Sequence, residues 1–350
     1  MSAKQTKKNS GKRVAMTVLC VVLGVILIGM LAGTIVVNHL YGKMNYVDPE
    51  TEVTLSQEEL DELLGSDEPV PDVTGPVMDE NEIQWGEKHD IQIGGEEDDN
   101  VINILLIGQD ARPGWGRSRS DSMILCTINK EKKTLTMTSF LRDLYVQIPG
   151  YADNKLNATY VAGGMKLLND TLDHNFGIHV DGNVEVDFSR FAQLVDLLGG
   201  VDMELRQDEA NYINAGSTSG EWLSAGMQHL NGEQALTYSR IRSLDLDSDF
   251  SRTNRQRKVI NALIEKFKNS NLTTILALLD EALPMVTTDM TQAEIVSLVT
   301  EVFPLLKDMQ IVSQRVPIDG TYSCPMIRSM SVVLADMDAN REFLKETLGD

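Results

Sequence analysis

The chain has 350 residues and a formal net charge of −21, from 31 Lys and Arg against 52 Asp and Glu. That length is enough for one large domain or two small ones, and the charge argues against a protein that binds nucleic acid through a broad basic surface. Hydrophobic residues make up 42% and aromatic residues 5% of the chain, which excludes a polytopic membrane protein.

The N-terminus predicts a membrane anchor. Residues 1–13 contain five basic residues and no acidic one, and Val14–Val37 then run without a charge. In a helix, at about 1.5 Å per residue, this run can cross a bilayer. A cleavable signal peptide is the alternative, but its apolar region is normally about 7–15 residues and a small-residue cleavage site should follow. The basic flank predicts a cytoplasmic tail at 1–13, a single transmembrane pass at 14–37 and an extracellular remainder.

Residues 38–100 predict an acidic extracellular stalk. Between Asp48 and Asp99 there are 19 acidic residues and one basic residue, with several prolines and glycines. Such a segment repels itself and is expected to be extended. Within it, Ser56 and Glu59 have the spacing of a capping box, which predicts a short helix from Ser56 to Leu64.

One folded domain is predicted over residues 101–350. Val101–Gly108 is an almost fully apolar run that predicts a buried strand, and Met123–Asn129 and Thr134–Phe140 predict a hairpin. Residues 182–205 show a β-α-β pattern. Because helices alternate with buried strands, the fold class is α/β, a single α-β-α layered domain with a central mixed sheet. The remaining predicted elements are helices at 157–175, 188–198, 232–240, 249–269, 273–283, 292–306 and 338–348 and strands at 182–187, 201–205 and 309–317.

The three cysteines do not form a metal motif. Cys20 lies in the predicted anchor, Cys126 in an apolar run and Cys324 in a loop-like stretch. A disulfide between the last two is one alternative, and buried free thiols are the simpler interpretation.

The arginines are the main functional signal, because several lie beside acidic residues at the ends of predicted elements. The first group follows the first strand, where α/β sheets build their sites. The groups are Asp110, Arg112, Arg117, Arg119 and Asp121; Arg142 and Asp143; Arg240 and Arg242; and Asp249, Arg252, Arg255 and Gln256.

The helix predicted from Asp249 has a face that is polar at its start and apolar further along. At about 100° per residue, Asp249, Arg252 and Gln256 share a face with Ile260 and Leu263. Unpaired buried charge is costly, so this pattern favours a cleft with a charged mouth and an apolar interior. A salt-bridge network at the start of the helix is the alternative.

Converging arginines indicate a phosphate or carboxylate ligand, because guanidinium groups are forked donors that stay charged. Asp110 and Asp121 beside such a ligand predict Mg²⁺, with Mn²⁺ as an alternative, since Mg²⁺ binds one or two carboxylates together with phosphate oxygens and water. Arginines and Mg²⁺ around a phosphoanhydride are typical of phosphoryl transfer. The sequence has no Walker loop, so a nucleotide is not expected.

The chain closely resembles the LytR-CpsA-Psr (LCP) family of bacterial cell-wall ligases. The resemblance covers about residues 101–268, and its stretches occur in family order: NILLIGQDAR, GRSRSDSMIL, SFLRDLYVQIPG, KLNATYVAGG, VDFSRFAQLVDLLGGV, LNGEQALTYSRIR and DFSRTNRQRKVI. It implies an α-β-α catalytic domain with a buried lipid cleft. It also implies transfer of an anionic glycopolymer, such as teichoic acid or capsule, from a polyprenyl-pyrophosphate carrier to the muramic acid 6-hydroxyl of peptidoglycan.

The resemblance also implies roles for the arginine groups. Arg142, Arg240 and Arg242 would be catalytic and hold the pyrophosphate, while Asp110 and Asp121 would bind the metal and orient the arginines. Asp121 is in addition our candidate for the base that activates the sugar hydroxyl. The predicted substrate-binding residues are Arg112, Arg119, Asp249, Arg252 and Gln256.

Three alternatives share this site. A hydrolase would use water in place of the sugar hydroxyl, and a lipid-binding module would hold the carrier without reaction. A non-catalytic regulator of transcription is the third, but an acidic extracellular domain is badly placed to contact nucleic acid. The predicted partners are therefore the lipid-linked glycopolymer, peptidoglycan and the membrane.

Overall fold

The computed structural model describes residues 45–65, 75–86, 91–95, 98–109, 117–245, 248–268, 281–291, 294–295, 298, 301–302 and 304–349. The predicted anchor at 14–37 lies outside these residues, as do most of the helix predicted at 273–283 and much of the one predicted at 292–306. None of the helices in the described ranges is both long and apolar enough to cross a membrane.

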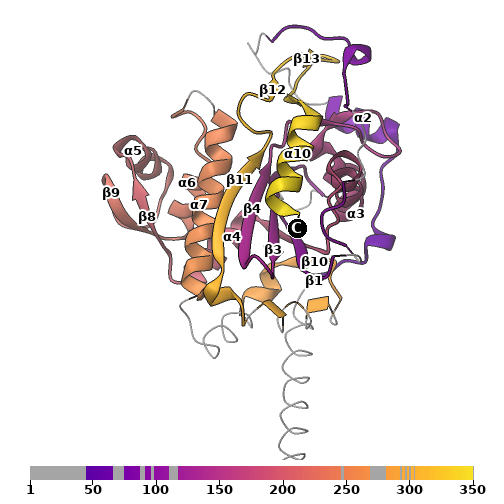
Figure 1. The fold of residues 1–350 in the computed structure, drawn as a ribbon. Coiled ribbons are helices and arrows are strands. Elements are labelled where there is room, and N and C mark those ends of the chain that lie inside the picture. The colour runs from indigo at the N-terminus through magenta and orange to yellow at the C-terminus, as the bar shows by residue number, and fades with distance from the viewer. Residues whose placement is uncertain are drawn as a thin grey trace, which may run out of the picture.

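A seven-stranded mixed sheet forms the centre of the molecule (Figure 1). Its order is β1 (Asn45–Tyr46), β10 (Thr287–Thr288), β7 (Gly182–Asp187), β2 (Val101–Gln109), β3 (Ser120–Asn129), β4 (Thr134–Phe140) and β11 (Gln310–Val316). The predicted hairpin of β3 and β4 is confirmed, and β7 runs parallel to β2. The carboxyl ends of β2, β4 and β7 therefore lie at the same edge of the sheet as the beginning of β3. This is the edge where α/β proteins commonly build their sites.

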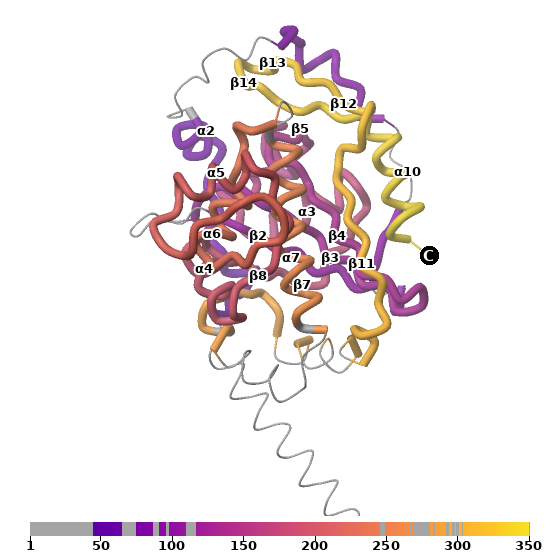
Figure 2. The backbone as a smooth tube through the Cα atoms, turned by 90° about the vertical axis from the view of Figure 1, so that its left-hand side faces the viewer, coloured from indigo at the N-terminus to yellow at the C-terminus, as the bar shows by residue number. Residues whose placement is uncertain are grey.

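Helices cover both faces of this sheet (Figures 1 and 2). They are α2 (Gln57–Gly65), α3 (Leu156–Phe176), α4 (Phe188–Leu197), α5 (Gln207–Gly216), α6 (Gly232–Ser239), α7 (Ser248–Lys268) and α10 (Met337–Leu348). Neighbouring residues of β2 point to opposite faces: Leu105 packs in a core with α3 and α10, and Ile104 packs in another with Ile260 of α7. The mixed α/β domain with a central mixed sheet is thereby confirmed.

The short strands are β5 (Tyr145–Val146), β6 (Asn154–Lys155), β12 (Tyr322–Ser323), β13 (Met326–Ile327), β14 (Met330–Ser331) and β15 (Leu334–Ala335).

The β-α-β pattern predicted at 182–205 forms as β7, α4 and the strand at 201–205, but this second strand does not join the central sheet. β8 (Val201–Leu205) pairs antiparallel with β9 (Gly226–Leu230), and with α5 they form a side lobe (Figure 1). Gly199 and Gly200, with φ of 74° and 70°, turn the chain after α4. The residues of β8 alternate between buried and exposed, as expected of a strand with one solvent face.

The extended stalk was also wrong for the described part of residues 45–95, because this segment packs on the domain. β1 is an edge strand of the central sheet, and Leu60 of α2 is fully buried beside α3. Further along the chain, Trp85 stacks on Tyr145 with ring centroids 6.0 Å apart, and Ile93 is fully buried. The few apolar residues of this segment thus pack in the core of the domain. The acidic composition of the segment did not indicate this packing.

Two local predictions need correction as well. The helix predicted at 157–175 forms as α3, but Gly163 and Gly164 have non-helical backbone angles and divide it into two halves. Cys126 and Cys324 are both free thiols, as the simpler interpretation held, but only Cys126 is buried.

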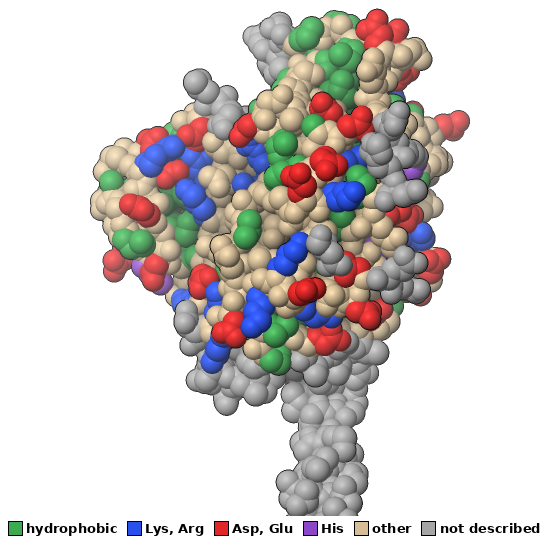
Figure 3. All heavy atoms as spheres, viewed as in Figure 1, with side chains coloured by type: hydrophobic (Ala, Val, Ile, Leu, Met, Phe, Trp, Pro, Cys, Tyr) green, Lys and Arg blue, Asp and Glu red, His purple; other side chains and the backbone are tan. Residues whose placement is uncertain are grey.

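On the face of the domain seen in Figure 3, acidic and basic side chains are interspersed. Exposed ion pairs of this kind contribute little to stability.

A buried network around Arg255 of α7 is different, because Arg255 and Glu209 of α5 are only 4% and 7% exposed and pair at 2.9 Å. Arg255 also pairs with Asp245 and donates to the carbonyl of Ile241 at 3.3 Å. It therefore joins the side lobe to α7 and fixes the segment that carries two predicted site arginines.

We predict that Arg255→Met lowers the free energy of unfolding by about 3–5 kcal/mol, because the buried carboxylate of Glu209 loses its partner at 2.9 Å and its remaining cation, Arg206, lies 3.9 Å away. Arg206→Met is the matched control: Arg206 pairs with Asp245 at 2.8 Å, but its side chain is 49% exposed. Its loss should cost less than about 1 kcal/mol. Urea unfolding of the purified full-length variants, followed by tryptophan fluorescence, measures both differences. Equal losses would contradict the structural role assigned to Arg255.

Candidate active site

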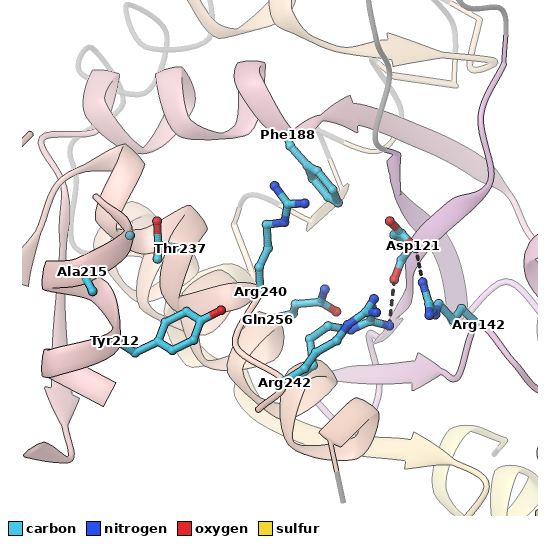
Figure 4. A pocket seen from close by; sticks show the side chains of 11 residues that line it. Asp121, Arg142, Phe188, Tyr212, Ala215, Thr237, Arg240, Arg242 and Gln256 are labelled. Carbon is cyan, nitrogen blue, oxygen red and sulfur yellow. Dashed lines mark hydrogen bonds and ion pairs between the residues drawn. The ribbon is translucent and has the colours of Figure 1, made fainter. Parts of the chain in front are cut away.

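A charged pocket of about 700 Å³ lies at the sheet edge where β2, β4 and β7 end. Figure 4 shows labelled arginines from two segments directed toward it, with Phe188 beside Arg240 and Tyr212 on the opposite wall. The pocket is lined by Asp121, Arg142, Phe188, Tyr212, Ala215, Gly216, Thr237, Arg240, Arg242, Arg252 and Gln256.

A β-bulge places Asp121 in this pocket. β2 and β3 pair in register as far as Gly108 and Ser122, but Gln109 then pairs with Ser120. Asp121 is therefore the extra residue of the bulge. Bulges bend a strand and redirect the side chain of the extra residue, and they are common beside active sites.

Arg142 is at the centre of the charges around the pocket. Its guanidinium contacts Asp121 at 2.8 Å, Asp143 at 3.3 Å and Asp249 at 3.4 Å. Burial alone would lower the pKa of Arg142, but the three carboxylates raise that pKa above its ordinary value. The amide of Asn157, at the start of α3, donates to the carbonyl of Arg142 at 3.1 Å and fixes its backbone. Arg142 is thus held in place as a permanent cation.

Asp249 connects arginines that come from different elements. Its carboxylate contacts Arg142 at 3.4 Å, Arg242 at 3.4 Å and Arg252 at 3.6 Å. Burial raises the pKa of Asp249, and Arg142 and Arg242 oppose this shift. Because one carboxylate pairs with three guanidinium groups, it offsets part of their mutual repulsion.

Arg240, at the end of α6, differs from the other arginines of the pocket. Its guanidinium carbon lies 4.8 Å from the ring centroid of Phe188, a cation–π contact. Within the part of the chain that the structure describes, Arg240 forms no ion pair. Its N–H groups can therefore turn to an anionic ligand without breaking a salt bridge.

An apolar cavity of about 220 Å³ adjoins the charged pocket, and Phe188 and Gln256 line both. The predicted change along α7 is confirmed, because Arg252 lines the charged pocket while Ile260 and Leu263 line the apolar cavity. A ligand with an anionic head and an apolar tail would find matching surfaces side by side. The other residues of the apolar cavity are Leu106, Ile107, Gly108, Ser122, Ile124, Val184, Val186, Phe191, Leu194, Leu236 and Ser239.

The structure brings together most of the predicted site residues. Asp121, Arg142, Arg240, Arg242, Arg252 and Gln256 line the pocket. Asp249 pairs with three of these arginines. Arg119 is described but does not line the pocket, and Asp110 and Arg112 lie outside the described residues.

Other residues of the site had no predicted role. Asp143 contacts both Arg142 and Lys155, the latter at 2.9 Å. Burial alone would raise the pKa of Asp143, but Arg142 and Lys155 lower it. The sequence placed Asp143 in one group with Arg142, which it directly follows, but gave it no role. Phe188 and Tyr212 carry no charge, and only the tertiary structure brings them to the pocket.

Asp121 is the one predicted metal ligand in the described ranges. No three His, Cys, Asp or Glu side chains in those ranges are grouped so as to hold a metal ion. Mg²⁺ needs only one or two carboxylates when phosphate oxygens and water complete its coordination. The carboxylate of Asp121 is 23% exposed, which fits this role. Metal binding here would therefore depend on a bound phosphate.

Two curated relatives show the sequence similarity. MsrR of Staphylococcus aureus, named a regulatory protein, is 35% identical over 195 residues, or 53% of this chain and 57% of MsrR. TagV of Bacillus subtilis, named a polyisoprenyl-teichoic acid–peptidoglycan teichoic acid transferase, is 33% identical over 174 residues, or 49% of this chain and 44% of TagV. The chain thus spans about half the length of the curated relatives it matches.

The fold is also similar to that of a solved structure. TagT with bound octaprenyl pyrophosphate lipid superposes with a TM-score of 0.56 and 25% identity, covering 75% of this chain and 95% of that one. The model of the LytR_cpsA_psr family matches residues 73–346. This match includes every arginine of the charged pocket and every strand of the central sheet except β1. The chain therefore belongs to the LytR_cpsA_psr family.

Proposed function

We propose that the protein is a phosphotransferase that moves an anionic glycopolymer from a polyprenyl-pyrophosphate carrier to the muramic acid 6-hydroxyl of peptidoglycan. The observation that carries the proposal is that the charged pocket continues into the apolar cavity past Phe188 and Gln256. A polyprenyl pyrophosphate has the complementary chemistry, with two phosphates attached to a long apolar chain. Arginine suits such phosphates because its forked donors stay charged.

The relatives support this proposal. TagV is named a transferase of teichoic acid from a polyisoprenyl carrier to peptidoglycan, and TagT was solved with octaprenyl pyrophosphate. MsrR carries a regulatory name instead. The net charge of −21 argues against a regulator that binds nucleic acid through a broad basic surface.

The proposed reaction exchanges one phosphorus–oxygen bond for another. The acceptor hydroxyl oxygen bonds to the phosphorus that carries the glycopolymer, and the bond from this phosphorus to the bridging oxygen breaks. Polyprenyl phosphate leaves, and the hydroxyl proton passes to a base. Arg142, Arg240 and Arg242 would neutralise the charge that develops on the phosphates. Asp121 is the proposed base.

A divalent cation, Mg²⁺ or Mn²⁺, would neutralise further charge on the pyrophosphate when bound. Asp121 and Asp110 are the proposed ligands. Asp121 thus has two proposed roles, and they predict different effects of a substitution. Lys155 and Asp143 would support either role by fixing Arg142, which contacts Asp121 at 2.8 Å.

We also propose that residues 14–37 anchor the protein in the cell membrane, with residues 1–13 in the cytoplasm and the folded domain outside. The uncharged run behind a basic flank supports this proposal. A lipid-linked substrate is confined to the membrane, so an anchored enzyme meets it at high local concentration.

Product analysis tests the proposed function. The full-length protein is incubated with a polyprenyl-pyrophosphate-linked polymer, with and without peptidoglycan oligomers, and the products are identified by mass spectrometry. A transferase gives polymer joined to peptidoglycan. Free polymer released at the same rate without acceptor would indicate a hydrolase, and no turnover in either sample would indicate a lipid-binding or regulatory protein.

We predict that Arg240→Ala abolishes transfer and retention of polyprenyl pyrophosphate but leaves the melting temperature of the lipid-free protein unchanged. Arg240 has no ion pair within the described ranges, so its removal leaves no described carboxylate unpaired. Arg142→Ala should lose retention too, but it should also lower stability by about 2–3 kcal/mol, because three partly buried carboxylates lose a partner. Lipid mass spectrometry and thermal unfolding measure the two properties, with Arg206→Ala as the surface control. Normal retention of lipid by Arg240→Ala would refute its role.

We predict that chelation by EDTA stops transfer and that added Mg²⁺ restores it. Asp121→Asn should then distinguish the two roles of this residue, because it removes a charged ligand with little change in volume. A metal-ligand role predicts that the variant needs much more Mg²⁺ for half-maximal rate. A base role predicts a lower maximal rate at an unchanged Mg²⁺ requirement. Full activity in EDTA would remove the metal from the mechanism.

A further inference from the structure

A carboxylate from the N-terminal segment lies in the middle of α3. The helix is broken at Gly163 and Gly164, and the break frees the amide groups of its second half. The carboxylate of Glu52 accepts a hydrogen bond from the amide of Met165 at 2.8 Å. Free amides and the helix dipole both favour a negative charge at this position. Glu52 therefore caps the second half of α3 from a distant part of the chain.

Arg117 is the second partner of Glu52. The two side chains pair at 3.1 Å and are only 19% and 9% exposed. Arg117 also donates to the carbonyl of Val53. A Cβ atom added to Gly164 would clash with both charged groups, so the ion pair occupies the space that the missing side chain leaves. The glycines at 163 and 164 thus leave room for a salt bridge between Glu52 and Arg117, which lies three residues before β3.

The chain between Arg117 and the bulge is also fixed from the opposite side. The amide of Ser118 donates to the side-chain carbonyl of Gln109 at 3.1 Å. The backbone of Gln109 pairs with Ser120, and its side-chain amide donates to Glu185 of β7. Residues 117–120 are therefore held between Glu52 and Gln109 immediately before Asp121.

We propose that Glu52 and Arg117 are positioning residues for the transfer reaction, which makes the N-terminal segment part of the catalytic apparatus. Their ion pair holds the four residues that lead into the bulge and thereby sets the direction of the Asp121 carboxylate. This inference rests on the proposed function. Capping of α3 alone would need only Glu52, whereas the guanidinium of Arg117 extends the contact to the strand that carries Asp121.

The experiment compares Glu52→Gln, Arg117→Met and the double variant in the full-length protein. Each single variant is expected to lower kcat by about 10- to 100-fold, the effect of a misplaced catalytic group, with KM for the lipid-linked polymer within about twofold. The double variant should be no slower than the slower single variant, because both remove one interaction. Polyprenyl lipid should still copurify at the wild-type level, since the pocket arginines are intact.

Two further variants serve as controls. Lys166→Met removes an exposed cation from the same turn of α3, whose partner is Asp170 at 3.0 Å, and it should leave kcat unchanged. Arg117→Lys keeps a cation beside Glu52 and should restore most of the rate. Wild-type kcat in Glu52→Gln and Arg117→Met would overturn the proposal. A parallel loss of kcat, lipid retention and melting temperature would also overturn it, because that result describes a purely structural pair.

A second measurement does not depend on transfer activity. Hydrogen exchange followed by mass spectrometry should show faster exchange over residues 117–122 in both single variants, while α10 exchanges as in the wild type. Unchanged exchange over 117–122 would overturn the proposal even if the wild-type protein transferred no polymer. Absence of transfer by the wild type, with the expected change in exchange, would instead refute only the proposed function.

Discussion

Four arginines converge on one pocket, and their mutual repulsion is the constraint on which the site depends. Asp249 reduces this repulsion directly, because its carboxylate pairs with three of the four arginines. Asp121 and Asp143 compensate Arg142 further. Arg240 is stacked on Phe188 instead, which leaves its donors available. Within the described residues, these three carboxylates do not cancel the charge of the four arginines, so a ligand with two phosphates can complete the compensation.

The sequence predicted best those features whose signal is local. β2, the hairpin of β3 and β4, and α7 all appear within a few residues of their expected bounds. The face of α7 could be predicted because helical periodicity alone fixes which residues share it. The strand pairing of β8 and the packing of the segment at 45–95 could not be predicted in the same way. The surfaces that cover them come from distant parts of the chain, and neither an apolar run nor an acidic composition identifies those surfaces.

The same distinction applies to the site. Residue type and position at the ends of predicted elements were enough to select Arg142 and Arg240 before the pocket was known. Helical periodicity also separated Arg252, which lines the pocket, from Arg255, which pairs with Glu209 in the side lobe. Three residues on a helix change direction by about 60°, but only the packing of α5 shows what Arg255 contacts on its own side of the helix. The bulge at Asp121 depends on the register of β2 and β3, which no local pattern encodes.

The place of β1 in the sheet limits how far the enzyme can reach under the proposed anchoring. β1 begins at Asn45 and the proposed membrane span ends at Val37, so residues 38–44 alone connect them. Even fully extended, these residues cover at most about 25 Å. The domain would have to work next to the bilayer, and distant layers of the wall would be beyond its range. Newly exported glycan strands would then receive the polymer, and its distribution through the wall would record the order in which the strands were made.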